Sequence, residues 1–427
     1  MRLWSRRVAA ARTAAIAVAL GAGLVGSPVT APGAAAETFA VRGATVHPVS
    51  SLAIDNGTVL VKDGRIVSVG EAGSVSVPSG AEVIDGTGLH LWPGLIDAMS
   101  RLGLMEIGSV LGTRDHTELG DMNPNARAEV ALNASSSHLG VTRSNGILLA
   151  ASVPYGRLVP GTSAAIALEG WTWEELVRLA PLGLNIEWPD MPAGRPKDDP
   201  KDKKDDDKPT WEDKVVALDE MIAEAVAYGE AIAEDPASRG RDVRWEALQT
   251  VISGETPVWI HATSIPQIRA ALDWTARHGL RMVLVDGTSA TCGDAWQLAA
   301  ELKARGIPVI VKTTRRPARN YEPYDTPYRA PARLAEAGLP LAFGSWTSAH
   351  ARRLPQEAAR AVAYGLPRAD AERALTLGAA EIFGIDDRYG SLEAGKSATM
   401  ILVRGDLLET RMNVEAAWID GAALDLD

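Results

Sequence analysis

Apolar and polar positions alternate over short runs near both ends of the chain. Asp63-Gly64 and Asn56-Gly57 stand between such runs at one end and Asp420-Gly421 at the other, and such pairs are typical of tight hairpin turns. The β-type runs are 39–42, 57–62, 65–70, 399–403 and 414–419. We therefore predict one small β-domain built from residues 37–90 and 388–427.

The central part of the chain has a different pattern, in which a short apolar run precedes each stretch of helical spacing. Val258-Trp-Ile precedes a predicted helix over 267–278, and Met282 to Val285 precedes another over 293–305. Strands that alternate with helices are typical of βα units and a parallel sheet. Over this length a closed barrel is the expected solution, and we predict an α/β fold with a barrel at residues 91–387.

One segment interrupts this pattern. Residues 193–210 contain mostly Lys, Asp and Pro, so they cannot bury enough apolar surface to fold. We predict a charged, disordered surface insertion, and favour this over a cation-binding tract because each carboxylate has lysines close by in the chain. The segment from Trp211 to Ile232 again has apolar residues at helical spacing, which predicts a helix packed on the barrel.

The first 36 residues have the pattern of a cleavable signal peptide. Four arginines precede an uncharged run over 13–25, and three alanines follow at 34–36. The run is shorter than the roughly 20 residues that span a bilayer, so a retained anchor is the less favoured alternative. We predict export to the periplasm or the exterior, with the general and the twin-arginine routes both open because of Arg6-Arg7.

The net charge and the cysteine content exclude some classes of binding partner and an intrachain disulfide. The formal net charge of -11, with no basic block, argues against nucleic acid and against anionic membranes as partners. The single Cys292 excludes an intrachain disulfide. We expect a small-molecule substrate or ligand, no membrane partner after signal cleavage, and leave a homo-oligomer open.

Two distant motifs carry a family resemblance. Pro-Gly-Leu-Ile-Asp-Ala at 93–98, preceded by Asp85-Gly-Thr-Gly, resembles the opening barrel strand of the amidohydrolase superfamily, and 371–395 resembles its closing stretch. Trp259-Ile-His-Ala resembles the fifth strand, and 352–365 resembles the imidazolonepropionase-like branch. The resemblance implies a (β/α)8 TIM barrel plus a small β-sandwich from both termini, with the site at the carboxyl ends of the strands.

The resemblance also implies a site for one or two divalent metals, but the ligand positions have changed. Met99 and Arg101 stand where the family has His-x-His, and Trp346 matches the final-strand Asp. A thioether and a permanently charged guanidinium are poor ligands for such a metal. His261, Asp286 and Glu187 remain as candidate ligands, for one zinc, manganese or iron ion in an eroded site. A carbonyl-bound histidine and a helix-capping aspartate are the open alternatives for His261 and Asp286.

Two further histidines, His116 and His350, follow predicted barrel strands and are candidate substrate-binding residues together with Arg101 and Trp346. The segment 112–127 around His116 is too polar for a core and is a candidate lid or binding rim. No Gly-x-Ser-x-Gly, no phosphate-binding Gly-x-x-x-x-Gly-Lys and no cysteine cluster occurs, which sets serine hydrolases, P-loop proteins and zinc fingers aside.

Three functional hypotheses follow. In the first, the protein hydrolyses C–N bonds in amides, cyclic amides or dipeptide-like molecules, with His261 and Asp286 as the catalytic or metal pair and Arg101 binding an anionic group. In the second, the barrel is catalytically inactive and binds a small organic anion or a partner at Met99, Arg101 and Trp346. A scaffold without a ligand is the third. Whether the protein is an enzyme stays open at this stage.

Overall fold

The computed structural model describes residues 38–191, 209–235, 240–287, 293–312, 318–319 and 322–426. The chain divides into two units, 1–36 and 37–427, and all described residues belong to the second. The predicted signal peptide, nearly all of the predicted insertion and Cys292 lie outside the described residues. Within the described ranges, no helix has both the length and the apolar character needed to cross a bilayer.

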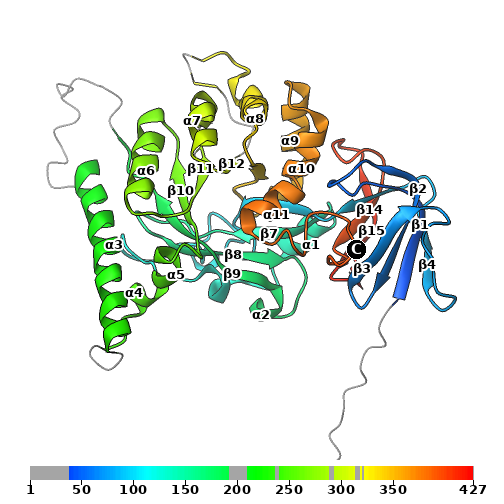
Figure 1. Ribbon diagram of the computed structural model, residues 1–427, viewed down its shortest axis with the longest axis horizontal. Coiled ribbons are helices and arrows are strands. Elements are labelled where there is room, and N and C mark those ends of the chain that lie inside the picture. The colour runs from blue at the N-terminus through cyan, green and yellow to red at the C-terminus, as the bar shows by residue number, and fades with distance from the viewer. Residues whose placement is uncertain are drawn as a thin grey trace, which may run out of the picture. The chain divides into compact units, whose positions relative to one another are not determined.

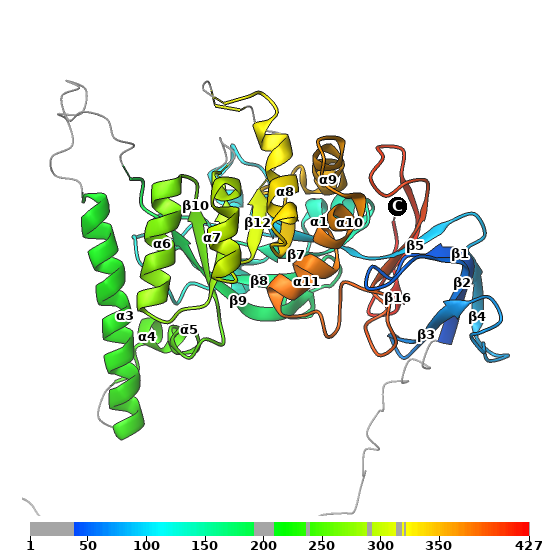
Figure 2. The same cartoon turned by 45° about the horizontal axis from the view of Figure 1, so that its top comes forward.

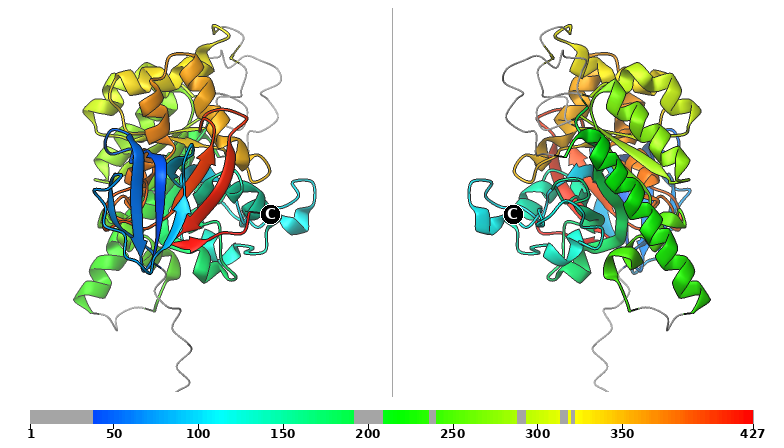
Figure 3. Two further views of the ribbon diagram at one scale, coloured as in Figure 1. Left: turned by 90° about the vertical axis from the view of Figure 1, so that its right-hand side faces the viewer. Right: turned by 90° about the vertical axis from the view of Figure 1, so that its left-hand side faces the viewer.

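Strands from both ends of the chain form one eight-stranded sheet (Figure 3, left). Its order is β16-β15-β14-β5-β1-β2-β3, with β4 also paired to β1. The strands are β1 Thr38–Val46, β2 Ile54–Lys62, β3 Arg65–Glu71, β4 Glu82–Asp85, β5 His90–Pro93, β14 Met400–Arg404, β15 Asn413–Ile419 and β16 Ala422–Ala423. The predicted β-domain from both termini is therefore confirmed.

This sheet folds over a core of its own. The rings of Phe39 on β1 and Trp418 on β15 stack with centroids 5.5 Å apart, although three strand spacings separate β1 from β15 in the sheet order. Neighbouring strands lie about 4.8 Å apart, so a flat sheet could not bring these rings together. Buried Val41, Val59 and Leu91 complete this core.

The three predicted turns in this domain have different outcomes. Asp420-Gly421, with φ of 49° and 82°, connects β15 to β16 as expected. Asp63-Gly64, with φ of 52° and 76°, connects β2 to β3 as expected. Asn56-Gly57 instead lies inside β2, where Asn56 has φ of 50° and Gly57 lies opposite Ala44. The turn prediction at Asn56-Gly57 is wrong because pairing with β1 continues through a bulge there.

The second eight-stranded sheet is the barrel, in the order β6-β7-β8-β9-β10-β11-β12-β13 (Figure 1). Its strands are β6 Leu95–Ser100, β7 Ile147–Ser152, β8 Gly161–Ala167, β9 Val177–Glu187, β10 Val258–Ala262, β11 Met282–Asp286, β12 Val309–Lys312 and β13 Leu341–Gly344. The residues just after β13 return to β6, since Trp346 N donates to Met99 O at 2.7 Å and Ser345 N to an Asp97 carboxylate oxygen at 2.9 Å. The sheet is thus a nearly closed barrel.

Helices cover the outside of the barrel (Figure 2). They are α1 Ser137–Arg143, α2 Trp173–Leu176, α3 Trp211–Glu234, α4 Val243–Ala247, α5 Gln249–Ile252, α6 Ile265–Arg277, α7 Ala299–Ala304, α8 Thr326–Glu336, α9 Leu354–Ala363, α10 Arg368–Ala374 and α11 Leu377–Phe383. The predicted helices at 211–232 and 267–278 correspond to α3 and α6. Each begins at a capping box, Thr210 with Asp213 and Ser264 with Gln267, which explains where both helices start.

The barrel departs from eight regular βα units at its third strand. β8 is antiparallel to both β7 and β9, while the other seven strands run in one direction. The link from β7 to β8, residues 153–160, contains Pro154, Gly156 and Pro160 and is too short for the crossover that a parallel pair requires. This link therefore stays at the carboxyl end of β7, where it borders the site.

Candidate functional site

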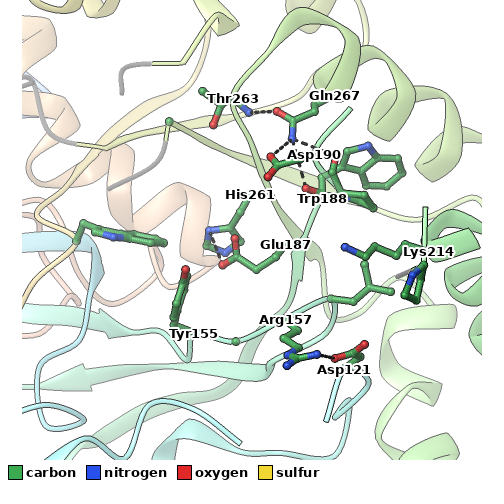
Figure 4. Close-up of a pocket in the computed structure, with 16 residues that line it drawn as sticks. Asp121, Tyr155, Arg157, Glu187, Trp188, Asp190, Lys214, His261, Thr263 and Gln267 are labelled. Carbon is green, nitrogen blue, oxygen red and sulfur yellow. Dashed lines mark hydrogen bonds and ion pairs between the residues drawn. The ribbon is translucent and has the colours of Figure 1, made fainter. Parts of the chain in front are cut away.

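A cavity of about 630 Å³ opens at the carboxyl ends of the parallel strands (Figure 4). Strands β9 and β10, the β7–β8 link, the segment after β13 and the first turn of α3 contribute to its wall. The side chains that line it include Tyr155, Arg157, Glu187, Lys214, His261 and Trp346. The volume is in the range of small-molecule sites.

A buried polar cluster joins the ends of β9 and β10. Glu187 lies opposite His261 in the parallel register, and its Oε1 is 3.7 Å from His261 Nδ1. His261 Nε2 is 3.1 Å from Asn185 Oδ1, while Asn185 Nδ2 donates to the carbonyl oxygens of Gly161 and Gly183. Because both partners of Nδ2 are acceptors, Oδ1 must face the imidazole, so His261 Nε2 carries the hydrogen and Nδ1 is directed toward Glu187.

Arg101, just after β6, lies between two aromatic rings. Its guanidinium carbon is 4.7 Å from the Tyr155 ring centroid and 5.1 Å from that of Trp346. Burial lowers the pKa of Arg101, while Tyr155 and Glu187 act in the opposite direction, and an arginine keeps its charge at neutral pH. With the described residues, the Arg101 guanidinium makes no hydrogen bond or ion pair, although Nε is buried. A partly desolvated cation of this kind favours an anionic ligand.

Trp346 forms the wall next to Arg101. Its backbone has φ of 62°, a left-handed conformation that is unusual for a bulky residue. The ring centroid is 5.6 Å from that of His261 and 6.3 Å from that of Tyr155. The Met99 side chain, 1% exposed, fills the barrel beneath. The β6 and β13 side of the mouth is therefore aromatic, apolar and cationic.

These residues do not fit the divalent metal that the resemblance implies. Met99 and Arg101 offer a buried thioether and a cation where imidazoles would be needed. Asp286, 3% exposed, accepts a hydrogen bond from Ala295 N at 3.3 Å, at the start of a 3-10 turn, Ala295–Leu298. In the part of the chain that the structure describes, no three His, Cys, Asp or Glu side chains converge as a metal site would require. The metal role of His261, Asp286 and Glu187 stays a prediction.

The two loop histidines lie away from the cavity wall. His116 is 8% exposed, with its ring 6.4 Å from that of Tyr155. Burial, reinforced by the charges of Arg101 and Arg114, lowers its pKa to about 4, so His116 is neutral at physiological pH. Its backbone oxygen accepts from Tyr155 N, which places His116 behind Tyr155. His350 is exposed just before the 3-10 turn Ala351–Arg353.

The structure thus brings together His261, Glu187 and Trp346 in the wall, with Arg101 packed against Tyr155 and Trp346. Sequence reasoning did not identify Tyr155, Asn185 or Lys214. A usable signal existed for Asn185, a polar residue between Leu184 and Ile186 in an apolar strand, since a buried polar group is normally hydrogen-bonded to a specific partner. Tyr155 and Lys214 had no comparable signal.

Sequence comparisons identify amidohydrolases as proteins similar to this chain. Residues 249–424 match the model of the amidohydrolase family. An amidohydrolase named tasK from Hapsidospora irregularis is 24% identical over 419 residues, which cover 86% of this chain and 40% of that protein. The chain therefore spans about two fifths of the length of this curated relative.

Solved structures resemble the fold at low sequence identity. An amidohydrolase from Thermotoga maritima MSB8 aligns with a TM-score of 0.78 and 24% identity, over 91% of this chain and 99% of that one. A prolidase complexed with N-methylphosphonate-L-proline aligns at 0.55 and 18%, over 91% and 99%. An adenosine deaminase from Xanthomonas campestris with bound zinc aligns at 0.50 and 18%, over 90% and 92%. The imidazolonepropionase-like branch stays a prediction; residues 249–424 match the amidohydrolase family, and the chain has the fold of the solved amidohydrolase from Thermotoga maritima.

Proposed function

We propose that this protein is a hydrolase that takes a small organic molecule with an anionic group into the barrel cavity and cleaves a C–N bond in it. The observation that carries the proposal is the Arg101 guanidinium, which has no hydrogen bond or ion pair with the described residues and packs on Tyr155, a residue of the cavity that contains the Glu187 and His261 pair. Similarity to amidohydrolases supports the reaction class.

Arg101 is the group that binds the substrate. A guanidinium presents a planar set of donors that matches a carboxylate or phosphate, and such charge-assisted bonds strengthen where water is excluded. The faces of Tyr155 and Trp346 fix the plane of the guanidinium and provide cation–π contacts in the absence of a ligand. An anion at this position replaces the lost hydration of Arg101.

Glu187 and His261 are the proton-transfer groups. The Glu187 side chain is 25% exposed, so it can reach a water molecule in the cavity. Glu187 takes a proton from water as the oxygen attacks the carbonyl carbon, and His261 Nδ1, which carries no hydrogen, can hold that proton in turn. The same proton goes to the leaving nitrogen as the C–N bond breaks, so both residues end in their starting state.

The expected rate is modest. General acid–base catalysis contributes roughly 10²–10⁴-fold, and the residues present do not fit a metal that would generate hydroxide. We therefore expect slow turnover of activated C–N bonds, with strained cyclic amides ahead of ordinary amides and dipeptides. The predicted signal peptide would place this reaction outside the cytoplasm.

A second candidate is a barrel that binds a small organic anion without turnover. The specific observation in its favour is that Met99 and Trp346 fill the side of the mouth where the resemblance places metal ligands. Arg101 would bind the same ligand class in both cases. The two candidates differ only in whether the bound molecule is cleaved.

The deciding experiment assays the purified full chain against amides, cyclic amides and dipeptides that each carry a carboxylate, with and without a chelator. Metal content is measured by plasma mass spectrometry in parallel. Glu187→Gln is expected to lower kcat at least a hundredfold, while Glu234→Gln, an exposed position at the end of α3, leaves it unchanged.

Three outcomes would overturn parts of the proposal. Full activity in Glu187→Gln removes that residue from the chemistry. Activity that the chelator abolishes, together with stoichiometric metal, contradicts hydrolysis without a metal. Saturable binding that depends on Arg101, with no turnover of any compound, selects the second candidate.

A further inference from the structure

A second cation lines the same cavity. Lys214 lies in the first turn of α3 and is partly buried, and its side chain extends toward the cavity from the side opposite Tyr155 in the view of Figure 4. The described residues provide no hydrogen bond and no ion pair for its ammonium group. α3 therefore brings an uncompensated positive charge to the mouth of the barrel.

The other charged groups around Lys214 already have partners. Arg157 pairs with Asp121 at 3.1 Å. Asp190 accepts from Gln267 Nε2 at 3.3 Å, and Asp213 accepts from the backbone and the hydroxyl of Thr210, each at 2.9 Å. The partners of Asp190 and Asp213 are neutral, so both keep their charge, but among the described residues neither makes a hydrogen bond or an ion pair with the Lys214 ammonium group.

The two uncompensated cations lie on either side of the proton-transfer pair. Arg101 packs on the Tyr155 ring, and in Figure 4 Glu187 lies between Tyr155 and Lys214. Because Tyr155, Glu187, His261 and Lys214 all line the same cavity, a molecule that extends from the Tyr155 side to Lys214 lies along the wall that contains His261 and Glu187. The cavity volume of about 630 Å³ accommodates such an elongated small molecule.

We infer that the substrate carries two anionic groups, one bound by Arg101 and one by Lys214, with the C–N bond between them. The chemical class is an acyl amino acid with a carboxylate at each end. This inference rests on the proposed function. It makes Lys214 a specificity-determining residue, because only the second carboxylate distinguishes this class from ordinary acyl amino acids.

The test compares matched ligands on the full chain. N-succinyl, N-glutaryl and N-adipoyl glycine each carry two carboxylates, and the corresponding N-butanoyl, N-pentanoyl and N-hexanoyl glycines carry one. Binding is followed by calorimetry and by the intrinsic tryptophan fluorescence, since Trp188 and Trp346 both line the cavity. We expect at least one dianion to bind about tenfold more tightly than its monoanionic counterpart, as a charge-assisted contact implies.

Lys214→Met isolates the second contact. It is expected to remove the preference for the dianion and to leave the affinity for the monoanion unchanged. Lys62→Met, at the exposed end of β2 in the other sheet, is the matched control and should change neither affinity.

The binding results distinguish a failure of the second anion contact at Lys214 from a failure of anion binding at Arg101. Equal binding of mono- and dianions by the wild-type protein, or a dianion preference that survives Lys214→Met, overturns this inference and leaves the proposed function standing. If none of the six compounds binds, the inference is wrong for acyl glycines. If smaller carboxylates also fail to bind, the proposed anion binding at Arg101 is wrong as well.

Discussion

The two halves of the barrel mouth differ in what their side chains can do. The half formed by β6 and the segment after β13 presents Met99, Arg101 and Trp346, which are large and cannot transfer a proton at neutral pH. The half formed by β9 and β10 presents Glu187 and His261, which can. One half is suited to holding a ligand and the other to acting on it.

The comparison indicates that the side chains on one half of a barrel mouth can be replaced while proton-transfer groups remain on the other half. Each half is held by its own hydrogen bonds: Trp346 N to Met99 O in the first, and the Asn185 side chain in the second. These hydrogen bonds share no residue, so a substitution that removes one set leaves the other in place, although the Trp346 and His261 rings are 5.6 Å apart. The predictions below test this separation.

The largest effect is expected from Arg101→Gln. Removing one partner of a desolvated charge pair costs about 2–5 kcal/mol of binding, so affinity for a carboxylate ligand should fall about thirtyfold or more. The variant should be at least as stable as the wild type, since a partly buried cation without a partner is lost. Calorimetric titration and thermal unfolding measure the two effects.

Arg157→Gln is the matched control for Arg101→Gln, because Arg157 lines the same cavity but is exposed and paired with Asp121. It should weaken binding by less than threefold, in keeping with the small energies of exposed pairs. Similar losses in both variants would mean that the whole mouth, and not its β6 half, attracts the anion.

Asp97→Asn probes the core beneath the first half. Complete burial raises the pKa of Asp97 from 3.8 to about 7, against hydrogen bonds from Ser345 and Met99, and the nearby Glu357 adds to the rise. Below about pH 4 the carboxyl is protonated in both states. Between pH 4 and 7 only the unfolded chain loses the proton, so the free energy of unfolding falls as pH rises, by up to roughly 4 kcal/mol.

At about pH 8 the Asp97→Asn variant should therefore be more stable than the wild type, by about 1–3 kcal/mol once the cost of an unpaired amide is included. Urea unfolding across pH 4 to 8 measures this. If the free energy of unfolding of the wild type did not change over this pH range, Asp97 would ionise in the folded protein at no cost in stability.

Asn185 tests the second half. Asn185→Leu removes the acceptor for His261 and both donors to the Gly161 and Gly183 carbonyl oxygens, so we expect a loss of about 1–3 kcal/mol of stability and a shifted pH profile of turnover. Asn185→Asp keeps an acceptor for His261 and loses only the donors. An identical pH profile in Asn185→Leu and wild type would exclude a positioning role for Asn185.

The smallest effect is expected from Thr210→Ala, which removes the N-cap of α3. Loss of such a cap costs about 1 kcal/mol, here confined to the first turn, which carries Lys214. Faster amide exchange in that turn, with unchanged anion affinity at Arg101, is the expected result. A loss of affinity as large as that of Arg101→Gln would show that the α3 side dominates binding.

Much of the scaffold could be predicted because it is encoded locally. Pro-Gly-Leu-Ile-Asp-Ala at 93–98 led to β6, and the Trp259-Ile-His run led to β10 with His261 at the carboxyl end of the fifth barrel strand. Helical spacing after residue 211 led to α3. In each case the sequence pattern or the motif that resembles the family lies within the residues that form the strand or helix.

The remaining features depend on contacts between distant segments. The reversed direction of β8 follows from a short link whose pattern resembles that of any loop. The partners of Asn185 come from β8, from β9 itself and from β10, and Lys214 reaches the cavity only because α3 packs at this end of the barrel. The apolar periodicity of a short segment does not indicate which distant segments it will contact.

The pairing of β5 with β14 also sets an order of events during folding. Leu91 lies opposite Leu402, so a strand made early in synthesis pairs only after the whole barrel segment has been produced. Until then the edge of β5 that receives β14 is open to other strands. Slow, late closure of this sheet follows, because contacts of long sequence separation carry the greatest loop-closure entropy. The nascent chain therefore passes through a period in which its barrel can be complete while its first sheet is still exposed to aggregation.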